Sequence, residues 1–239
     1  MYEITGRAVR SVLVSNKLRM RPGDFGPIYA ETVLGRFPVE PWNTFSNLIF
    51  LLIILVYAWR TRLCFSRFRF IVGALPILAL GFVGGTLFHA TRRHSIWLFM
   101  DFVPIFILAI MAATYFWSRL VRSRVLIILG GVGPTIIVRL IAWALDLPRH
   151  FSISLGYGAL ALTILIPAFL SARGRPMREL ALLVGAFLAI GIGLAFRVGD
   201  QTWGRELLPM GTHFLWHLFG GISVFLLIEY IFRTGSDGA

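Results

Sequence analysis

Residues 70–91 read FIVGALPILALGFVGGTLFHAT, which contains no acidic residue and no Lys or Arg. A helix needs about 20 predominantly apolar residues to cross the hydrocarbon core of a bilayer, so this stretch predicts a transmembrane helix. The strands of a membrane barrel would instead alternate apolar and polar residues with a period of two. Because the apolar residues here are continuous, the stretch favours a helical membrane protein.

Six further apolar stretches of similar length follow or precede this one. Short segments rich in Arg, Gly and Pro separate them, as expected of loops. The predicted spans are 44–59, 70–91, 96–117, 125–145, 151–172, 179–197 and 211–232. We therefore expect an all-α fold, a bundle of seven transmembrane helices.

The composition of the 239 residues supports this prediction, since 57% are hydrophobic and only 14% are charged. Soluble globular domains carry roughly 25% charged residues. We expect one seven-helix domain over residues 28–232, a basic N-terminal tail over 1–27 without the apolar core of a signal peptide, and a C-terminal tail over 233–239. The single cysteine, Cys64, excludes an intramolecular disulfide.

The net charge of +12 comes from arginines clustered between the apolar stretches. This distribution is typical of topology determinants, and no basic stripe interleaved with aromatic residues indicates a nucleic-acid partner. Counted over alternate loops close to the helix ends, Arg and Lys number eleven on one side and six on the other. The positive-inside rule therefore predicts an integral membrane protein with the N-terminus outside, periplasmic or lumenal, and the C-terminus in the cytoplasm.

Three histidines and one aspartate are predicted to lie at the same depth in the bilayer. His213 and His217, at the start of the last span, share one helical face because they are four residues apart. His89 ends the second span and Asp101 begins the third, so helix direction brings all four residues to one side. Buried unpaired polar residues are costly in a membrane. We therefore favour a zinc site near the outer, N-terminal face over unrelated polar residues at the interface.

Three histidine ligands plus a water are typical of a catalytic zinc site, whereas structural sites have four protein ligands. Zinc lowers the pKa of its bound water toward neutrality. Asp101 is suited to take a proton from that water and pass it to a leaving group. The alternative for Asp101 is to orient one of the histidines. His94 and His150 lie in or beside loops and are not expected to be ligands.

Several motifs resemble those of the alkaline ceramidase family, within the superfamily of seven-helix zinc hydrolases that includes adiponectin receptors and hemolysin III proteins. EPWNTFSNL at residues 40–48 resembles that family's ExWNTxSNL, and FHAT at 88–91, DFVPI at 101–105 and the HxxxH pair follow in the family's order. GTHFLWH at 211–217 and Tyr29-Ala-Glu are similar to motifs of bacterial members. The resemblance spans residues 28 to about 230.

This resemblance implies zinc on His89, His213 and His217, with Asp101 beside the zinc-bound water. It also implies hydrolysis of the amide bond of a ceramide-like lipid to a fatty acid and a long-chain amine. The family places a serine four residues before the first zinc histidine. That position is Gly85 here, and Thr86 could supply the hydroxyl only with local adjustment, since a helix turns about 100° per residue.

Some members of the family also bind calcium through acidic and amide groups of the N-terminal segment. Glu31 and Glu40 match two of those calcium ligands, whereas Ile28 and Val33 offer no side-chain oxygen to a hard cation. Asp24 is a further candidate oxygen ligand in this segment. The resemblance therefore leaves calcium binding open, with helix capping or salt bridges as the alternative role of the two glutamates.

Three further residues are candidates for contact with a substrate. Trp42 is expected near the outer interface, Asn47 either caps or bridges helices or lines the site, and Arg139 inside the fourth span either pairs with an aspartate (Asp101 or Asp200) or binds a substrate headgroup. Their positions follow from the predicted spans. The partners we expect are the lipid bilayer and a lipid substrate; the sequence says nothing of oligomeric state.

Two other functions remain open at this stage. A receptor-like or signalling protein with a structural zinc and little turnover would account for Gly85 at the serine position. A transporter or channel could use the polar cluster as an ion site, although no pair of interrupted helices in matching halves supports that interpretation. Metal content separates the transporter from the other two functions, and turnover separates the hydrolase from the receptor.

Overall fold

The computed structural model describes residues 22–235, and these form an α-helical bundle without strands in that range. The helices run α2 (Pro41–Ser46), α3 (Leu48–Thr61), α4 (Arg69–Thr91), α5 (Ser95–Ser118), α6 (Arg124–Ala144), α7 (Arg149–Ser171), α8 (Met177–Gly199), α9 (Trp203–Leu207) and α10 (His213–Thr234). Residues 1–21 and 236–239, most of the two predicted tails, lie outside the described range.

The all-α prediction is confirmed: seven helices in residues 22–235 are long and apolar enough to cross a membrane. The first of these spans combines α2 and α3, over Pro41–Thr61. Each predicted span lies within about three residues of an observed one. Because apolar length fixes which segments must be helical in a bilayer, the chain is a multi-pass membrane protein.

Exposed apolar side chains cover the outside of the bundle, as the α6 residues Ile128, Ile136, Leu140 and Trp143 illustrate. A water-soluble surface rarely carries contiguous apolar patches of this extent, whereas lipid tails solvate them without penalty. Proline occurs inside α4, α5, α6 and α7. Neighbouring helices and side chains can satisfy the backbone groups that proline frees in such a bundle.

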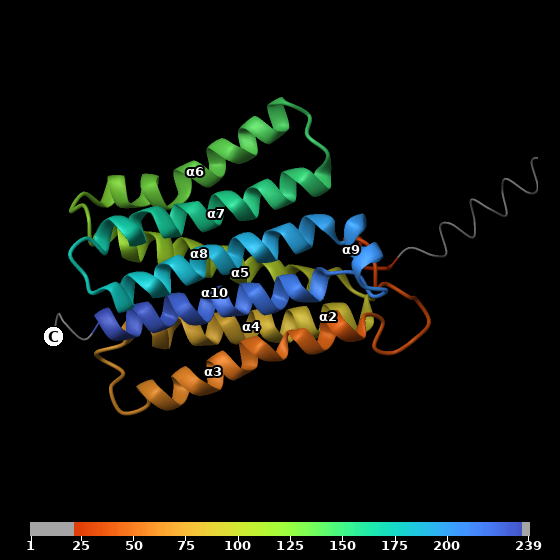
Figure 1. Ribbon diagram of the computed structural model, residues 1–239, viewed down its shortest axis with the longest axis horizontal. Helices are drawn as coiled ribbons and strands as arrows, with labels where there is room; N and C mark the ends of the chain where they lie inside the picture. Colours follow the sequence, from red (N-terminus) through yellow and green to blue (C-terminus); the bar gives the residue numbers. More distant parts are fainter. Residues whose placement is uncertain (1–21, 236–239) are drawn as a thin grey trace, which may run out of the picture.

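Figure 1 shows the helices side by side, with α3 and α6 at opposite edges and α10 across the face between them. Helix α10 packs against α8, α2, α3 and α4, while α5 packs against α4, α6 and α7. The segment before α2, the end of α4, the short α9 and the start of α10 gather at the end of the bundle away from the C-terminus. We call this the site end, because the residues singled out above lie there.

The segment 22–40 is part of the packed structure at the site end. Asp24, Tyr29, Glu31 and Glu40 are all buried, and Asp24 contacts Arg92 at the end of α4. The fold therefore includes residues ahead of the predicted domain boundary at residue 28. This segment supplies carboxylates and an aromatic ring to the site.

Candidate metal centre

His89, His213 and His217 converge in the interior of the site end. Each offers a ring nitrogen within 4.8 Å of those of the other two, and the three side chains are buried. His89 comes from the last turn of α4, and His213 and His217 from the first turns of α10. Helix direction and the four-residue spacing therefore bring the rings together as predicted, and the group can hold a metal ion.

The hydrogen bonds of the rings leave nitrogens free at the centre of the group. Nε2 of His89 and Nδ1 of His213 are buried without a hydrogen-bond partner. Nδ1 of His217 lies 2.8 Å from the Ser46 hydroxyl and 3.1 Å from the carbonyl oxygen of Asn43. Buried ring nitrogens without partners are rare and need an explanation. A metal ion bound by these imidazoles would supply the missing partner.

The partners of Nδ1 in His217 also fix which of its nitrogens faces the metal position. The Ser46 hydroxyl donates its hydrogen to the Asn43 carbonyl at 3.0 Å, so it accepts the Nδ1–H of His217. Nε2 of His217 then carries the lone pair. Metal-binding histidines almost always donate their other N–H to a carbonyl, carboxylate or hydroxyl in this way, so the geometry of His217 fits a zinc ligand.

Glu40 holds His89 in the same manner. Its Oε2 accepts the Nδ1–H of His89 at 2.5 Å, while Oε1 accepts hydrogen bonds from Thr32 and from Arg92. Burial alone would raise the pKa of Glu40, but the hydrogen bond and charge of His89 and the charge of Arg92 hold that pKa below its usual value. The ionised carboxylate orients the ring of His89 so that Nε2 points into the cluster.

Arg92 is a buried cation behind this carboxylate. Its Nε donates to Asp24 Oδ2 at 2.6 Å, and its Nη2 donates to Asp24 Oδ1 at 3.1 Å and to the carbonyl oxygen of Pro27 at 2.8 Å. Together with the contact to Glu40, these bonds satisfy a guanidinium that is 2% exposed. A buried charge needs such a complete set of partners. The ion pairs Asp24–Arg92–Glu40 therefore tie the N-terminal segment to His89.

Glu31 has a capping role at the start of α2. Its two carboxylate oxygens accept the backbone N–H groups of Trp42 at 2.6 Å and Asn43 at 2.9 Å. These N–H groups belong to the first turn, which lacks intrahelical acceptors. Burial raises the pKa of Glu31, and the two N–H groups oppose that effect.

The calcium prediction finds no support in this arrangement. Glu31 caps a helix, and Glu40 and Asp24 bind Arg92, so the expected carboxylates already have protein partners. Among the described side chains, those of residues 22–148 and 151–235, the histidine cluster is the only group of three or more His, Cys, Asp or Glu that could hold a metal. Arg92 places a positive charge where the carboxylates converge, which opposes binding of a cation.

Asp200 fixes the start of α10 and with it His213. Its Oδ1 accepts the backbone N–H groups of Thr212 at 2.8 Å and His213 at 2.9 Å, and its Oδ2 accepts that of Ala30 at 2.8 Å. A carboxylate at a helix N-terminus is favoured by the free N–H groups and the helix dipole. Gly211, with a φ of +75°, lets the chain turn there, where a Cβ would lie 2.4 Å from Asp200. Asp200 uses its oxygens in these bonds and forms no ion pair with Arg139, which was one of the alternatives for that arginine.

Tyr29 covers the cluster from the N-terminal segment. Its ring stacks on that of His213 with 3.8 Å between centroids and 22° between planes. Burial raises the pKa of Tyr29, so its hydroxyl stays protonated at neutral pH. The motif that contains Tyr29 was noted from the sequence, but its contact with a histidine was not predicted.

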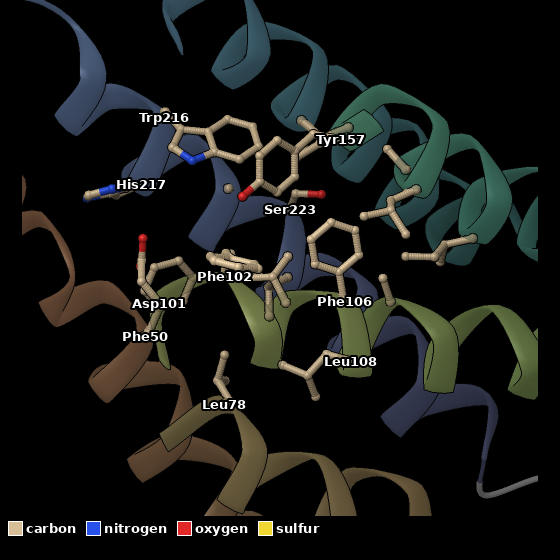
Figure 2. Close-up of a pocket in the computed structure, with 18 of the residues that line it drawn as sticks. Phe50, Leu78, Asp101, Phe102, Phe106, Leu108, Tyr157, Trp216, His217 and Ser223 are labelled. Carbon is tan, nitrogen blue, oxygen red and sulfur yellow. The ribbon is translucent and has the colours of Figure 1, made fainter. Parts of the chain in front are cut away.

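An elongated cavity of about 600 Å³ opens beside the histidines. Asn47, Asp101, His213 and His217 line one end of it, and apolar side chains of α4, α5, α7 and α10 line the rest. Figure 2 shows Asp101 and His217 at the same end, with Phe102, Phe106 and Leu108 following along α5. The volume falls within the range of roughly 300–1,000 Å³ typical of small-molecule sites.

Of the remaining candidate residues, some line the cavity and others do not. Asn47 and Arg139 line the cavity, whereas Trp42 does not and packs its ring against Phe214. Thr86 is also absent from the cavity wall, and its hydroxyl is buried without a partner. At Gly85, a Cβ would lie 2.6 Å from Asp101 Oδ1 and 3.1 Å from Asn47 Oδ1. Asp101 and Asn47, which line the cavity, therefore lie against α4 at Gly85, one residue away from Thr86.

Tyr157 of α7 and Arg197 of α8 also line the cavity, and no role was predicted there for Tyr157. Tyr157 lies beside Trp216, with 5.2 Å between ring centroids, as Figure 2 shows. Neither belongs to a motif that could have identified it from the sequence. Their position at the cavity depends on the packing of α7 and α8 against α10.

Comparison with known proteins leaves the site to be interpreted from its own residues. The chain matches no protein-family model and no curated protein. The geometry nevertheless supports two plain statements. The chain is a multi-pass membrane protein, and its three buried histidines form a group that can hold a metal ion beside a largely apolar cavity.

Proposed function

We propose that this protein is a membrane-embedded, zinc-dependent hydrolase that cleaves the amide bond of ceramide-like lipids. One observation carries the proposal: the buried imidazoles of His213 and His217 line a lipid-sized cavity together with the carboxylate of Asp101, and the imidazole of His89 lies close enough to them to share a metal ion. The motif resemblance to alkaline ceramidases supports the same reaction. Zinc also suits three imidazole ligands at a site that leaves a fourth position open.

His89, His213 and His217 would hold the metal, oriented by Glu40, by the backbone bonds of Asp200 and by Ser46 with the Asn43 carbonyl. Zinc at such a site activates water near neutral pH and polarises a carbonyl group. Other residues of the chain orient these three ligands. Each ring is fixed by a partner outside the cluster, so the site is formed before a substrate binds.

Substrate binding and proton transfer are assigned to the residues around the cavity. The apolar walls of α4, α5 and α10 hold the acyl chain and exclude water from it. Asp101 accepts a proton from the attacking water and delivers it to the amide nitrogen as the carbon–nitrogen bond breaks. The net change adds OH to the acyl carbon and H to the nitrogen, which gives a fatty acid and an amine. Asn47 lies close enough to Gly85 and Asp101 to help orient the reacting groups.

The test of the proposal is hydrolysis by the purified protein. We expect release of fatty acid from ceramide in detergent micelles, loss of that activity on chelation, and recovery when one equivalent of zinc is restored. If the protein binds one zinc per chain but cleaves no lipid amide, the hydrolase is excluded and the receptor-like function with a structural zinc takes its place. If it binds no zinc, neither function stands.

Substitution of Gly85 by Ala is expected to slow turnover about 10–100-fold without removing zinc. The added Cβ would lie 2.6 Å from Asp101 Oδ1, so the carboxylate must rotate away, and a displacement of about 1 Å can cost that much. Gly73→Ala on the same helix is the matched control, because no atom lies within 4 Å of its Cβ position. Equal turnover of the two variants would show that the placement of Asp101 over Gly85 is unimportant.

The side of the membrane that the site faces can be tested with the native cysteine. Cys64 is exposed between α3 and α4, at the end of the bundle opposite the site. With the N-terminus outside, as we propose from the arginine distribution, a membrane-impermeant maleimide should label Cys64 only after cells are permeabilised. A Cys64→Ser, Glu206→Cys variant, which carries its thiol at the site end, should be labelled on intact cells. The reverse pattern would invert the proposed orientation.

A further inference from the structure

Two arginines line the same cavity as the histidines, and neither has an acidic partner. Arg139 of α6 and Arg197 of α8 both contribute to the wall, but the ion pairs among residues 22–235 include neither of them. Asp101 lines the cavity too, and no ion pair among the described residues joins it to either arginine. The cavity therefore contains two positive charges that are not held in an ion pair with any described residue.

Arg197 is held in place by aromatic rings. Its guanidinium carbon lies 5.1 Å from the centroid of the Tyr157 ring and 5.8 Å from that of Trp216. Its Nε is buried without a hydrogen-bond partner. Stacking on aromatic faces stabilises the cation but uses none of its five N–H donors. The donors of Arg197 are thus available to an acceptor inside the cavity.

Arg139 approaches the cavity from the neighbouring helix. Its Cδ is 3.9 Å from the Cβ position of Gly156, the residue before Tyr157. Arg139 therefore lies against α7 at Gly156, and both arginines lie beside the same turn of α7. Helix α6 ends at Ala144, so Arg139 lies about 8 Å in from the helix end at 1.5 Å per residue.

The depth of Arg139 in the bundle is close to that of Asp101, the residue proposed to transfer the proton. Asp101 is six residues from the start of α5 at Ser95, which is about 9 Å at the same rise. An arginine within a transmembrane segment is expensive unless it faces a cavity or an anion. Its planar fork of donors is suited to carboxylate and phosphate groups, which it binds through paired hydrogen bonds.

We propose that Arg139 and Arg197 form a subsite for an anionic group on the amine side of the lipid amide, so that the preferred substrates carry a carboxylate or a phosphate there. This inference rests on the proposed function. The cavity follows α10 from His213 to Ile231, about 27 Å at 1.5 Å per residue, and its apolar length leads away from the site end. An acyl chain in that length leaves the amine side of the amide among the arginines.

The test compares lipid amides that differ only in charge. N-palmitoylglycine is paired with N-palmitoylethanolamine, and ceramide 1-phosphate with ceramide, in a non-ionic detergent without phospholipid, so the substrate is the only anionic amphiphile. We expect kcat/KM to favour the anionic member of at least one pair by about 10–100-fold, as for hydrogen bonds to charged groups. The pair that shows the preference identifies the anion as carboxylate or phosphate.

Variants assign the preference to the two arginines. Arg197→Gln and Arg139→Gln should each remove most of this preference, measured as the ratio of kcat/KM for the charged and neutral substrates, whereas Arg197→Lys, which keeps the charge, should retain part of it. Arg122→Gln, an exposed position between α5 and α6 at the other end of the bundle, is the control. An unchanged preference in both glutamine variants, or no preference in either pair, would overturn the inference.

Binding without turnover separates this inference from the proposed function. The thermal unfolding temperature of the Asp101→Asn protein should rise more with N-palmitoylglycine or ceramide 1-phosphate than with its neutral partner, and the difference should vanish with Arg197→Gln. If this difference in binding is observed but the native protein hydrolyses no lipid amide, the anionic subsite is supported and the proposed hydrolase function is rejected. Equal cleavage and equal binding of charged and neutral lipids would keep the hydrolase and reject the subsite.

Discussion

The Asp101→Asn protein is expected to lose turnover by about 10²–10⁴-fold, the range typical of a missing general acid–base group, while it retains zinc. Asp101 lines the cavity beside His213 and His217 but is not one of the three converging imidazoles. Asparagine has nearly the same shape and can neither accept nor deliver the proton. Fatty-acid release and zinc content, measured on the same purified sample, check both halves of this prediction.

Glu206→Gln is a suitable control for this substitution, since it removes an exposed carboxylate of α9 at the same end of the bundle. The two failures of the prediction have different meanings. Native turnover in the Asp101→Asn protein would remove the proton-transfer role. Loss of zinc together with turnover would instead assign Asp101 to the orientation of a histidine ligand, the alternative that its position in the sequence left open.

The His217→Ala protein is expected to lose its zinc and to fall to background turnover. Two imidazoles would remain, fewer than the three protein ligands that catalytic zinc sites normally have. The substitution also leaves the Ser46 hydroxyl without its ring partner. His94→Ala is the matched control, because His94 is exposed before α5 and lies outside the cluster.

Metal analysis by mass spectrometry and a monodisperse elution profile would check the His217→Ala prediction together with the state of the fold. The control should keep both zinc and activity. A folded His217→Ala protein with full turnover would contradict the proposed centre, because the reaction would then proceed without one of its ligands.

The fold and the histidine cluster were predictable because each depends on local features of the sequence. Apolar length decides which segments span a bilayer, and the four-residue spacing of His213 and His217 puts both rings on one helical face. The position of His89 was predictable from helix direction. An even number of membrane crossings separates the end of α4 from the start of α10, so both lie on the same side of the bilayer. These arguments need no knowledge of which helices are neighbours.

The surroundings of the cluster were not predictable, because they depend on how irregular segments and distant helices pack. Arg92 was counted among the loop charges that set topology, yet it is buried between Asp24 and Glu40. Glu40 was interpreted either as a calcium ligand or as a salt-bridging residue, and its contact with His89 exists only because residues 22–40 fold back over the end of α4. The sequence of a short loop does not show whether its charged residue is exposed or buried in an ion pair.

The sequence also could not predict which of the candidate substrate-binding residues face the cavity. Asn47 and Arg139 line the cavity, but Trp42 does not, although it lies in the same motif as Asn47. Position near an interface does not reveal which way a side chain faces. The difference between Gly85 and Thr86 is one residue and about 100° around α4, and Gly85 is the one that lies against Asp101 and Asn47.

The central claim is that His89, His213 and His217 hold one zinc ion and leave a coordination position open. X-ray absorption at the zinc edge of the purified native protein tests it most directly. We expect one zinc per chain with about three imidazole nitrogens at roughly 2.0–2.1 Å and one further oxygen. A protein that retains no zinc, or whose zinc lacks imidazole scattering, would contradict the account.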